Sequence, residues 1–341
     1  MNDRHDNPIA TRRVRVLAVT RRPGSASFEH RVLDHVAPLA RRGVEVAWRE
    51  IPAGSAAPRA LLDEAAEADV VWWHRYLIGP WPWALGRWRK AARRIAFDFD
   101  DPLTYRSRGG VSFGRRAKFA MLLARCDAVL AGNEYLAELA RPHGRDVTVL
   151  PMAVPIPEVV PRPPGRAGRS ELLWLGGRAT GRYLDELMAA LDELAARRPE
   201  VTLRVVGHAV PPARRVQVDF RPWSPAEQEA ALRECRIGLC PMPDTPWTRG
   251  KCPYKVLQYM AFGMAWVGSA VGENVRTAGV APAEATGLLA ADDGQWVQAL
   301  TRLVDDPSAC EAMGARGRAY VEANHSEDVL ADRLAGLFRR L

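Results

Sequence analysis

The sequence predicts an α/β protein with two domains, each built on a doubly wound parallel sheet. Short apolar segments alternate with segments of helical periodicity along the whole chain, which is typical of parallel sheets covered by helices on both faces. Between the two halves, residues 151–169 (PMAVPIPEVVPRPPGRAGR) are too rich in proline for regular structure. The length of 341 residues is sufficient for two separate hydrophobic cores.

The first half contains six predicted strands. The segment VRVLAVT (14–20) forms the first strand, and a glycine-containing loop and a helix over 28–43 follow it. The other strands are short apolar runs separated by helical segments; they are 44–51, 69–73, 94–99, 127–132 and 147–151. We therefore expect a Rossmann-like domain over residues 1–152.

The second half repeats this pattern after a linker over residues 153–169. Its predicted strands are 171–177, 201–207, 216–220, 236–241, 264–269 and 286–290. Its predicted helices are 181–198, 225–234, 253–262, 295–304, 308–324 and a last one that reaches Leu341. We expect a second Rossmann-like domain over 170–325 and a C-terminal helix over 326–341 that packs back on the first domain. The carboxyl ends of both sheets are expected to face a central ligand cleft.

The composition indicates a soluble globular protein that binds no nucleic acid. The net charge is +8, but no nucleic-acid recognition motif accompanies it. No apolar stretch is long enough to span a bilayer, and the start MNDRHDNPIATRR lacks the apolar core of a secretory signal. Five scattered cysteines without metal-site spacing are typical of reduced thiols. We therefore expect a cytoplasmic location.

The stretch RGKCPYKVLQYMAFG (249–263) contains two of only four lysines among 48 basic residues. Pro253 marks the start of a helix, because proline is favoured in a first helical turn. This position places Lys255 where the helix dipole disfavours a cation, unless an anion binds beside it. Lys251 lies just upstream. The motif predicts a phosphate site; the alternative is a pair of solvated surface lysines.

A second candidate is the glycine-containing loop of ELLWLGGRATGRYLDEL. Gly176 and Gly177 follow a predicted strand and precede a predicted helix, so a ligand can approach the backbone closely there. Arg178 or Arg182 then lies within reach of a diphosphate. The alternative is a tight turn with two surface arginines.

Polar residues also follow two strands of the first half. Asp98, Asp100 and Asp101 end the strand RIAFDF and its loop, and His74 ends the strand DVVWW. At the carboxyl edge of a sheet these side chains suit hydrogen bonds to ligand hydroxyls or proton transfer. Aspartates that only cap a loop and a structural histidine are the alternatives. Gly24 and Ser25, with Ser27, are candidates for contact with a ligand in the loop after the first strand.

Residues 76–94 (YLIGPWPWALGRWRKAARR) are a candidate for peripheral membrane contact. Trp81 and Trp88 accompany a cluster of basic residues, which predicts a basic amphipathic surface. The alternative is an ordinary helix with packed tryptophans and a solvated basic face.

The segments RIGLCPMPD, KCPYKVLQYMAFGMAWVGSAVGEN and TGLLA, within residues 236–290, resemble the donor-binding half of glycosyltransferase family 4. The first half is similar too, so the resemblance covers nearly the whole chain. It implies a GT-B fold and a retaining enzyme that needs no metal and no cofactor beyond its co-substrate, a nucleotide-diphosphate sugar. It also implies that Lys255 and an arginine, Arg178 or Arg182, neutralise the diphosphate. By the same resemblance, His74 is expected near the donor sugar, and the loop with Gly24 and Ser25 against the sugar or acceptor.

The chain departs from this family at two positions. The family commonly carries two glutamates separated by seven residues, and here Gly250 and Gln258 occupy these positions. The second glutamate usually binds the ribose of the nucleotide, and the amide of Gln258 can make the same hydrogen bonds without charge. The pattern GKC…K…QYMA looks like the feature of a subgroup.

We therefore expect a glycosyltransferase that transfers a sugar from a nucleotide-diphosphate sugar to an acceptor hydroxyl, in the biosynthesis of a glycan or glycoconjugate. The acceptor is a carbohydrate, a lipid-linked molecule or a small molecule, and the enzyme is cytoplasmic or peripheral at the inner face of the plasma membrane. Two alternatives stay open: a catalytically inactive GT-B scaffold or sugar-nucleotide-binding protein, and a sugar-nucleotide epimerase on the same architecture.

Overall fold

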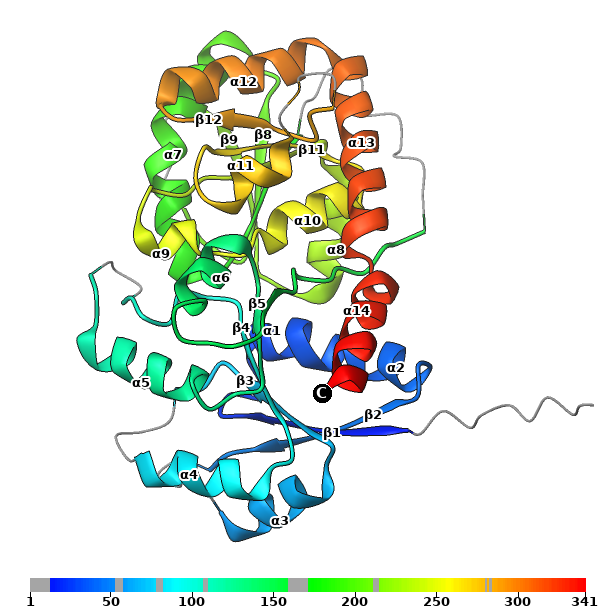
Figure 1. Ribbon diagram of the computed structural model, residues 1–341. Helices are drawn as coiled ribbons and strands as arrows, with labels where there is room; N and C mark the ends of the chain where they lie inside the picture. Colours follow the sequence, from blue (N-terminus) through cyan, green and yellow to red (C-terminus); the bar gives the residue numbers. More distant parts are fainter. Residues whose placement is uncertain are drawn as a thin grey trace, which may run out of the picture. The chain divides into compact units, whose positions relative to one another are not determined.

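The computed structural model describes residues 13–52, 58–77, 82–106, 110–158, 171–210, 215–279, 281 and 284–341. The chain divides into two compact units, shown in Figure 1. Unit 1 comprises Met1–Thr104, Ser112–Leu150 and Asp328–Leu341, and unit 2 comprises Tyr105–Val111 and Pro151–Glu327. Each unit contains one six-stranded sheet flanked by helices, which confirms the predicted fold class.

The sheet of unit 1 has the order β2-β1-β3-β4-β5-β6, and all neighbouring strands are parallel. Its strands are β1 (Val14–Thr20), β2 (Val44–Glu50), β3 (Val70–His74), β4 (Ile95–Phe99), β5 (Ala128–Ala131) and β6 (Val147–Val149). The chain leaves β1 toward β2 and then returns to the other side of β1 for β3. The topological switch point, where doubly wound sheets bind ligands, therefore lies between β1 and β3.

Helices cover both faces of this sheet. Against one face, a core that includes Trp73, Trp88 and Phe119 joins the sheet to α3 (Arg59–Glu67), α4 (Pro82–Ala91), α5 (Phe113–Leu123) and α6 (Glu134–Ala140). The remaining helices of unit 1 are α1 (Ala26–Phe28), a π-helical turn (Glu29–Leu33), α2 (Asp34–Ala40) and α14 (Glu327–Arg340). The predicted helix over 28–43 is therefore three consecutive short elements.

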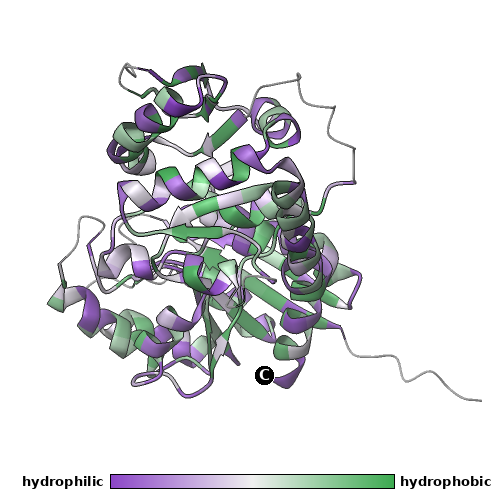
Figure 2. Cartoon of the chain, turned by 90° about the horizontal axis from the view of Figure 1, so that it is seen from above, coloured by the Kyte–Doolittle hydropathy of each residue, from purple (hydrophilic) through white to green (hydrophobic). Residues whose placement is uncertain are grey.

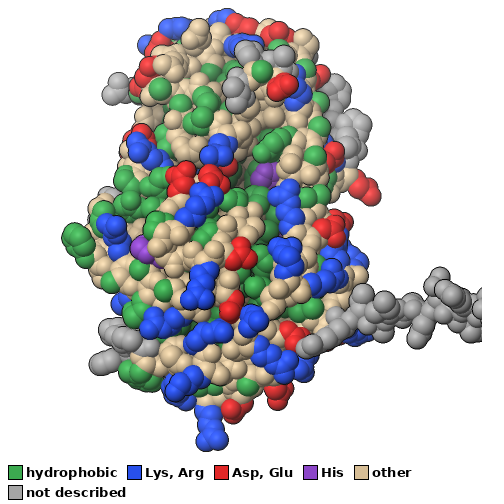
Figure 3. Space-filling model, in the orientation of Figure 1, with side chains coloured by type: hydrophobic (Ala, Val, Ile, Leu, Met, Phe, Trp, Pro, Cys, Tyr) green, Lys and Arg blue, Asp and Glu red, His purple; other side chains and the backbone are tan. Residues whose placement is uncertain are grey.

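The C-terminal helix α14 packs within unit 1. Phe338 is buried and meets Trp72 edge to face, with ring centroids 5.3 Å apart. Arg42 forms ion pairs with Asp328 and Asp332 at 3.0 and 2.6 Å. These contacts join the end of the chain to its first hundred residues. Figure 3 shows basic side chains scattered over the visible face of unit 1, interspersed with acidic ones.

The sheet of unit 2 is also parallel, with the order β12-β11-β10-β7-β8-β9. Its strands are β7 (Glu171–Leu175), β8 (Thr202–Val206), β9 (Gln217–Arg221), β10 (Ile237–Cys240), β11 (Ala265–Ser269) and β12 (Leu288–Ala290). Because β8 and β9 lie on one side of β7 and β10 lies on the other, the switch point of this sheet falls between β7 and β10.

Seven helices are described in unit 2. They are α7 (Arg178–Arg197), α8 (Pro225–Glu234), α9 (Pro246–Arg249), α10 (Tyr254–Ala261), α11 (Glu273–Ala278), α12 (Asp293–Asp305) and α13 (Pro307–His325). One apolar core joins α7 and α12 to the sheet, and another joins α8 and α10 to it. Figure 2 shows hydrophobic colouring concentrated on the strands.

The beginning of the predicted linker has regular contacts. Val154 is buried and forms a parallel bridge with Ser326, and the carbonyl of Met152 lies 2.9 Å from Nδ1 of His325. Residues 159–170, the rest of the proline-rich stretch, lie outside the described residues.

Candidate functional site

The switch point of unit 2 is held together by the phenol of Tyr259 in α10. The amide of Leu175, at the end of β7, donates to Tyr259 Oη at 3.2 Å, and the hydroxyl donates to the carbonyl of Leu239 in β10 at 3.2 Å. The ring packs directly on Gly238, where a Cβ would lie 2.2 Å from it. One side chain thus fixes α10 to the two strands between which a ligand is expected.

Two predicted donor-binding elements meet on the indole of Trp174, next to the end of β7. The ammonium of Lys255 lies 4.5 Å from the centroid of the Trp174 ring. The same ring lies under Gly176, where a Cβ would approach it to 2.6 Å. The structure therefore brings the glycine loop and the amino end of α10 together on one indole. Pro253 is the N-cap of α10, and no side chain caps this end.

The ammonium of Lys255 is half-buried and has no carboxylate partner among the described residues. Burial, with a smaller contribution from the charge of Lys251, lowers the pKa of Lys255 to about 8. The group is still mainly protonated at neutral pH, so the site holds a partly desolvated positive charge. A bound anion would compensate this charge, and the open amino end of α10 would add backbone N–H donors.

Gln258 lies one turn after Lys255 on the same face of α10. Its side chain is half-buried, and no protein group in the described part of the chain hydrogen-bonds to its amide. Lys251 lies in the loop between α9 and α10, with its ammonium 5.8 Å from the ring centroid of Trp247. Gly250 is the C-cap of α9, so a turn occupies the place of the family's first glutamate.

The two candidate arginines of α7 differ in their surroundings. Arg182 stacks on Tyr183 at 5.0 Å and donates to its hydroxyl at 3.2 Å. Arg178 is exposed at the first position of α7 and makes no ion pair with a described residue. Gly177 is the N-cap of this helix and provides no side-chain cap. Arg178 is therefore the better-placed partner for an anion at the start of α7.

In unit 1, His74 lies at the switch point between β1 and β3. Its Nδ1 lies 3.2 Å from Thr20 Oγ1, and its Nε2 lies 3.0 Å from Ser27 Oγ. Burial lowers the pKa of His74 to about 4, so the imidazole is neutral at pH 7. Ser27 also hydrogen-bonds to the carboxylate of Asp100. The loop after β1 is thus linked to the ends of β3 and β4 through Ser27.

Asp98 has a structural role in this protein, whereas the sequence predicts a catalytic role for it. Its side chain is fully buried, and Arg31 holds one carboxylate oxygen through two contacts of 2.9 and 2.6 Å. The indole N–H of Trp72 donates to the other oxygen at 2.9 Å. Both oxygens are therefore engaged inside the protein and do not face a substrate. Arg31 comes from the π-helical turn, 67 residues earlier, so no local pattern reveals the pair.

Asp100 and Asp101 lie at the end of β4, and both are ion-paired with Arg75. The guanidinium of Arg75 is 3.3 Å from Asp100 and closer to Asp101. Although burial opposes it, the charge of Arg75 holds the pKa of Asp100 below its ordinary value, with help from His74 and Ser27. Arg75 has φ of 52°, a strained backbone conformation for a residue with a side chain, of the kind that clusters at functional sites.

Gly24 and Ser25 occupy the loop after β1, close in sequence to Ser27. Ser25 caps α1 by accepting from the amide of Phe28, and its hydroxyl donates to the carbonyl of Arg22 at 2.9 Å. Gly24 is exposed, and a Cβ there would meet nothing within 4 Å. The cap accounts for Ser25, while nothing in the surroundings of Gly24 requires a glycine.

The predicted membrane-facing tryptophans are only partly where the sequence places them. Trp88 is fully buried and packs edge to face on Trp73 at 5.0 Å, so its prediction as a surface contact is wrong. Trp81 lies outside the described residues. Trp83 is instead 56% exposed, and Arg87 and Lys90 lie on the same stripe of α4. No described helix combines the length and apolar character needed to cross a bilayer.

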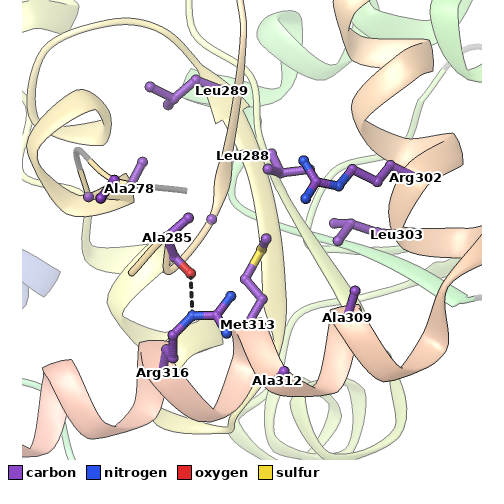
Figure 4. A pocket seen from close by; sticks show the side chains of 13 residues that line it. Ala278, Ala285, Leu288, Leu289, Arg302, Leu303, Ala309, Ala312, Met313 and Arg316 are labelled. Carbon is purple, nitrogen blue, oxygen red and sulfur yellow. Dashed lines mark hydrogen bonds between the residues drawn. The ribbon is translucent and has the colours of Figure 1, made fainter. Parts of the chain in front are cut away.

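A hollow with a volume of about 340 Å³ lies elsewhere in unit 2, between α11, β12, α12 and α13 (Figure 4). Its lining is mainly apolar, and Arg316 reaches across to the carbonyl of Ala285 at 2.9 Å. None of the predicted donor-binding residues lines it. Among the described residues, no group of three potential metal ligands occurs.

Comparison with known protein families matches residues 169–306 to the model described as glycosyl transferases group 1. Residues 169–306 are therefore similar to a group 1 glycosyltransferase domain. This domain contains Lys255, Gln258 and the glycine loop, and it marks the protein as a glycosyltransferase. A search of the curated proteins gave no match.

Solved structures of similar shape cover nearly the whole chain and show that the glycosyltransferase has the GT-B fold. Sucrose-phosphate synthase from Thermosynechococcus elongatus matches with a TM-score of 0.71 and 18% identity, over 96% of this chain and 99% of that one. HepE of Anabaena, solved in complex with UDP, matches with a TM-score of 0.70 and 14% identity, over 96% of this chain and 100% of that one. The UDP-forming α,α-trehalose-phosphate synthase from Burkholderia xenovorans matches with a TM-score of 0.65 and 14% identity, over 96% of this chain and 99% of that one.

Sequence reasoning missed two residues that build the domain's site. Trp174 and Tyr259 read as ordinary core residues, and both are in fact buried. The signal for Tyr259 was Gly238 in the middle of a short apolar strand, because such a glycine often marks close approach of another group. Trp174 gives no comparable signal.

Proposed function

We propose that the protein transfers a glycosyl group from a nucleotide-diphosphate sugar to an acceptor hydroxyl, with retention of anomeric configuration and without a metal ion. The ammonium of Lys255 stabilises the leaving diphosphate as negative charge develops on it, assisted by Lys251 just upstream and by Arg178 at the start of α7. Gln258 binds the ribose. The resemblance to family 4 supports retention, and the lysines provide the positive charge that a metal provides in other glycosyltransferases.

The observation that carries this proposal is the half-buried ammonium of Lys255 at the switch point of unit 2, which packs on Trp174 and has no carboxylate partner in the described part of the chain. A cation there without a ligand is unfavourable, as its lowered pKa indicates. A methionine at position 255 would have a similar volume and would avoid the burial of this charge. Its presence is explained by an anionic ligand at the carboxyl edge of the sheet, where doubly wound sheets bind ligands. HepE, a structure of the same fold, was solved in complex with UDP.

Unit 1 is proposed to bind the acceptor. Ser27, His74 and Asp100 form a hydrogen-bonded group at its switch point, and Asp101 is held beside them by Arg75. The neutral imidazole orients Ser27, whose hydroxyl and the Asp100 carboxylate suit sugar hydroxyls. Asp98 is not part of this proposed site, because its carboxylate is already satisfied.

The test is a transfer assay on matched lysine variants. Lys255→Met removes the charge and keeps most of the apolar stem, and we expect turnover to fall by about 100-fold or more. Lys118→Met is the control, because Lys118 is a half-buried lysine of α5 in unit 1, and this variant should retain wild-type turnover. Wild-type turnover of Lys255→Met would contradict the proposal. Loss of activity on removal of divalent metals by a chelator would contradict the metal-free mechanism.

A second candidate function is binding of a sugar nucleotide without catalysis. It is favoured by one observation, the absence of both family glutamates at Gly250 and Gln258. The same assay separates the two functions. Nucleotide binding that depends on Lys255, with neither transfer nor donor hydrolysis, would support the second candidate.

We also propose a cytoplasmic location with peripheral contact to an anionic membrane through α4. The exposed stripe of Trp83, Arg87 and Lys90 supports this contact, since α4 contains no acidic residue. Flotation with vesicles containing an anionic lipid tests it. Binding should fall on Trp83→Ser and with added salt, and equal binding of this variant would contradict the proposal.

A further inference from the structure

A second hollow, with a volume of about 350 Å³, opens at the carboxyl edge of the unit 1 sheet. Its lining comes from three neighbouring strand ends: Arg21 and Arg22 after β1, Glu50 and Ile51 at the end of β2, and Tyr76 after β3. It therefore lies at the switch point of this sheet, where a ligand is expected. Its volume falls in the range of small-molecule sites, roughly 300–1,000 Å³.

The two arginines of this hollow lack the partners that other arginines of unit 1 have. Arg42, Arg49 and Arg75 all pair with carboxylates. Among the described residues, neither Arg21 nor Arg22 has an ion pair, although Glu50 lines the same hollow. Two guanidiniums against one carboxylate leave the hollow with a net positive charge.

Neutral groups hold Arg21 in place. Its Nη1 donates to the hydroxyl of Tyr76 at 2.9 Å, its Nη2 donates to the carbonyl of Pro52 at 3.3 Å, and its guanidinium stacks over the Tyr76 ring at 4.6 Å. The guanidinium is therefore positioned before any ligand binds, and its charge is not neutralised. Such preorganised arginines bind phosphate or carboxylate groups well, because the guanidinium fork matches their oxygens.

The hollow is connected to the proposed acceptor site through Thr20. The amide of Arg22 donates to Thr20 Oγ1 at 3.2 Å, and the same oxygen lies 3.2 Å from Nδ1 of His74. A ligand of monosaccharide size that fills the hollow therefore lies close to the group formed by His74, Ser27 and Asp100.

We infer that the acceptor carries an anionic group, a phosphate or a carboxylate, which Arg21 and Arg22 bind in this hollow. The inference rests on the proposed function, because it names the class of acceptor for the same reaction. Glu50 accepts hydrogen bonds from hydroxyls of the acceptor and limits the hollow to one anionic group.

Binding is measured by calorimetry without any sugar nucleotide, so that its outcome does not depend on transfer. The probes are glucose 6-phosphate, glucuronate and glucose. We expect the anionic probes to bind at least about 10-fold more tightly than glucose, because charge-assisted hydrogen bonds are stronger than neutral ones. The stronger of the two anionic probes identifies phosphate or carboxylate as the preferred group. Equal affinity for all three, or binding of none, would overturn the inference.

Variants test the residues. Arg21→Gln and Arg22→Gln should each weaken binding of the preferred anionic probe by about 10-fold. Arg22→Lys should recover part of the lost affinity. Glu50→Gln should strengthen binding of this probe, because it removes a negative charge that repels the anion. Arg13→Gln, at the opposite end of β1, is the matched control and should change nothing.

UDP and GDP affinity should stay unchanged in all four lining variants. If these nucleotides bind normally and the arginine variants bind the anionic probe as well as wild type does, the inference fails while the proposed function stands. If the arginine variants lose binding of the anionic probe but the wild-type protein transfers no sugar from any nucleotide sugar, the proposed function fails and the anion site stands.

Discussion

At the scale of single residues, burial decides which charged groups are available for chemistry. Asp98 and Lys255 are both at carboxyl edges of sheets, but Asp98 is fully buried with Arg31, whereas Lys255 is half-buried without a carboxylate. A satisfied buried pair has no capacity left for a ligand, and breaking it costs about 3–5 kcal/mol. An unpaired charge at the rim of the sheet is free to bind one.

The lowered pKa of Lys255 predicts how nucleotide affinity depends on pH. A diphosphate binds the protonated ammonium and raises its pKa, so binding weakens as the free protein loses this proton above pH 8. We expect the affinity for UDP to fall up to about tenfold per pH unit between pH 8 and the pKa of the complex. Calorimetry at several pH values measures this, with correction for buffer ionisation.

Lys255→Arg provides the comparison, because arginine stays charged over this range. Its UDP affinity should be weaker at pH 7 but nearly independent of pH up to about 10. A wild-type profile as flat as that of the arginine variant would show that Lys255 does not titrate in the free site.

At the scale of elements, the sequence predicts the strands and helices that follow a recurring apolar pattern and misses the shortest helices. All twelve strands lie within or next to their expected segments, because runs such as VRVLAVT are apolar and bounded by breakers. The helices α9 and α11 have four and six residues, too few for a helical period to be recognised. In the site, Lys255 and Gly176 were predictable from glycine, proline and charge. Their common contact with Trp174 was not, because it joins residues 81 positions apart.

The packing of Tyr259 on Gly238 gives an element-scale prediction. Gly238→Ala places a methyl group 2.2 Å from the ring, so β10 and α10 must separate. We expect a loss of about 1–3 kcal/mol in the free energy of unfolding and weaker UDP binding, because Lys255 moves with α10. Chemical denaturation and calorimetry measure the two effects.

Gly86→Ala is the matched control for this substitution. Its Cβ would meet nothing within 4 Å, and alanine favours the helix α4, so stability should stay equal or rise by about 0.5–1 kcal/mol. Wild-type stability and UDP affinity in Gly238→Ala would show that Tyr259 does not fix α10.

At the scale of the whole molecule, the last helix, α14, packs on elements of unit 1 that come from the first part of the chain. The sequence predicts that residues 326–341 form a helix, since Leu330, Leu334 and Leu337 recur at helical spacing. Which surface this helix covers depends on Trp72 and Arg42, some 250 to 300 residues away, so only the structure reveals it. The division into units also assigns Tyr105–Val111 to unit 2, although the sequence places this segment in the first domain.

Removing the contact of Phe338 with Trp72 should destabilise unit 1. We expect Phe338→Ala to lower its free energy of unfolding by about 3–5 kcal/mol, because a buried ring leaves a cavity. Arg333→Ala, exposed on the same helix, should change it by less than about 0.5 kcal/mol. Thermal unfolding compares the two variants, and similar unfolding temperatures would contradict this role of α14.

The most direct measurement of the central claim follows the charge of Lys255 itself. The chain has only four lysines, so reductive ¹³C-dimethylation, which preserves their charge, gives few NMR signals to assign by single-lysine variants. In the free protein, the signal of Lys255 should titrate near pH 8, well below the ordinary lysine pKa of 10.5. Saturation with UDP should raise this pKa by about 1 unit or more. A Lys255 signal that titrates like a surface lysine and does not respond to UDP would contradict the account.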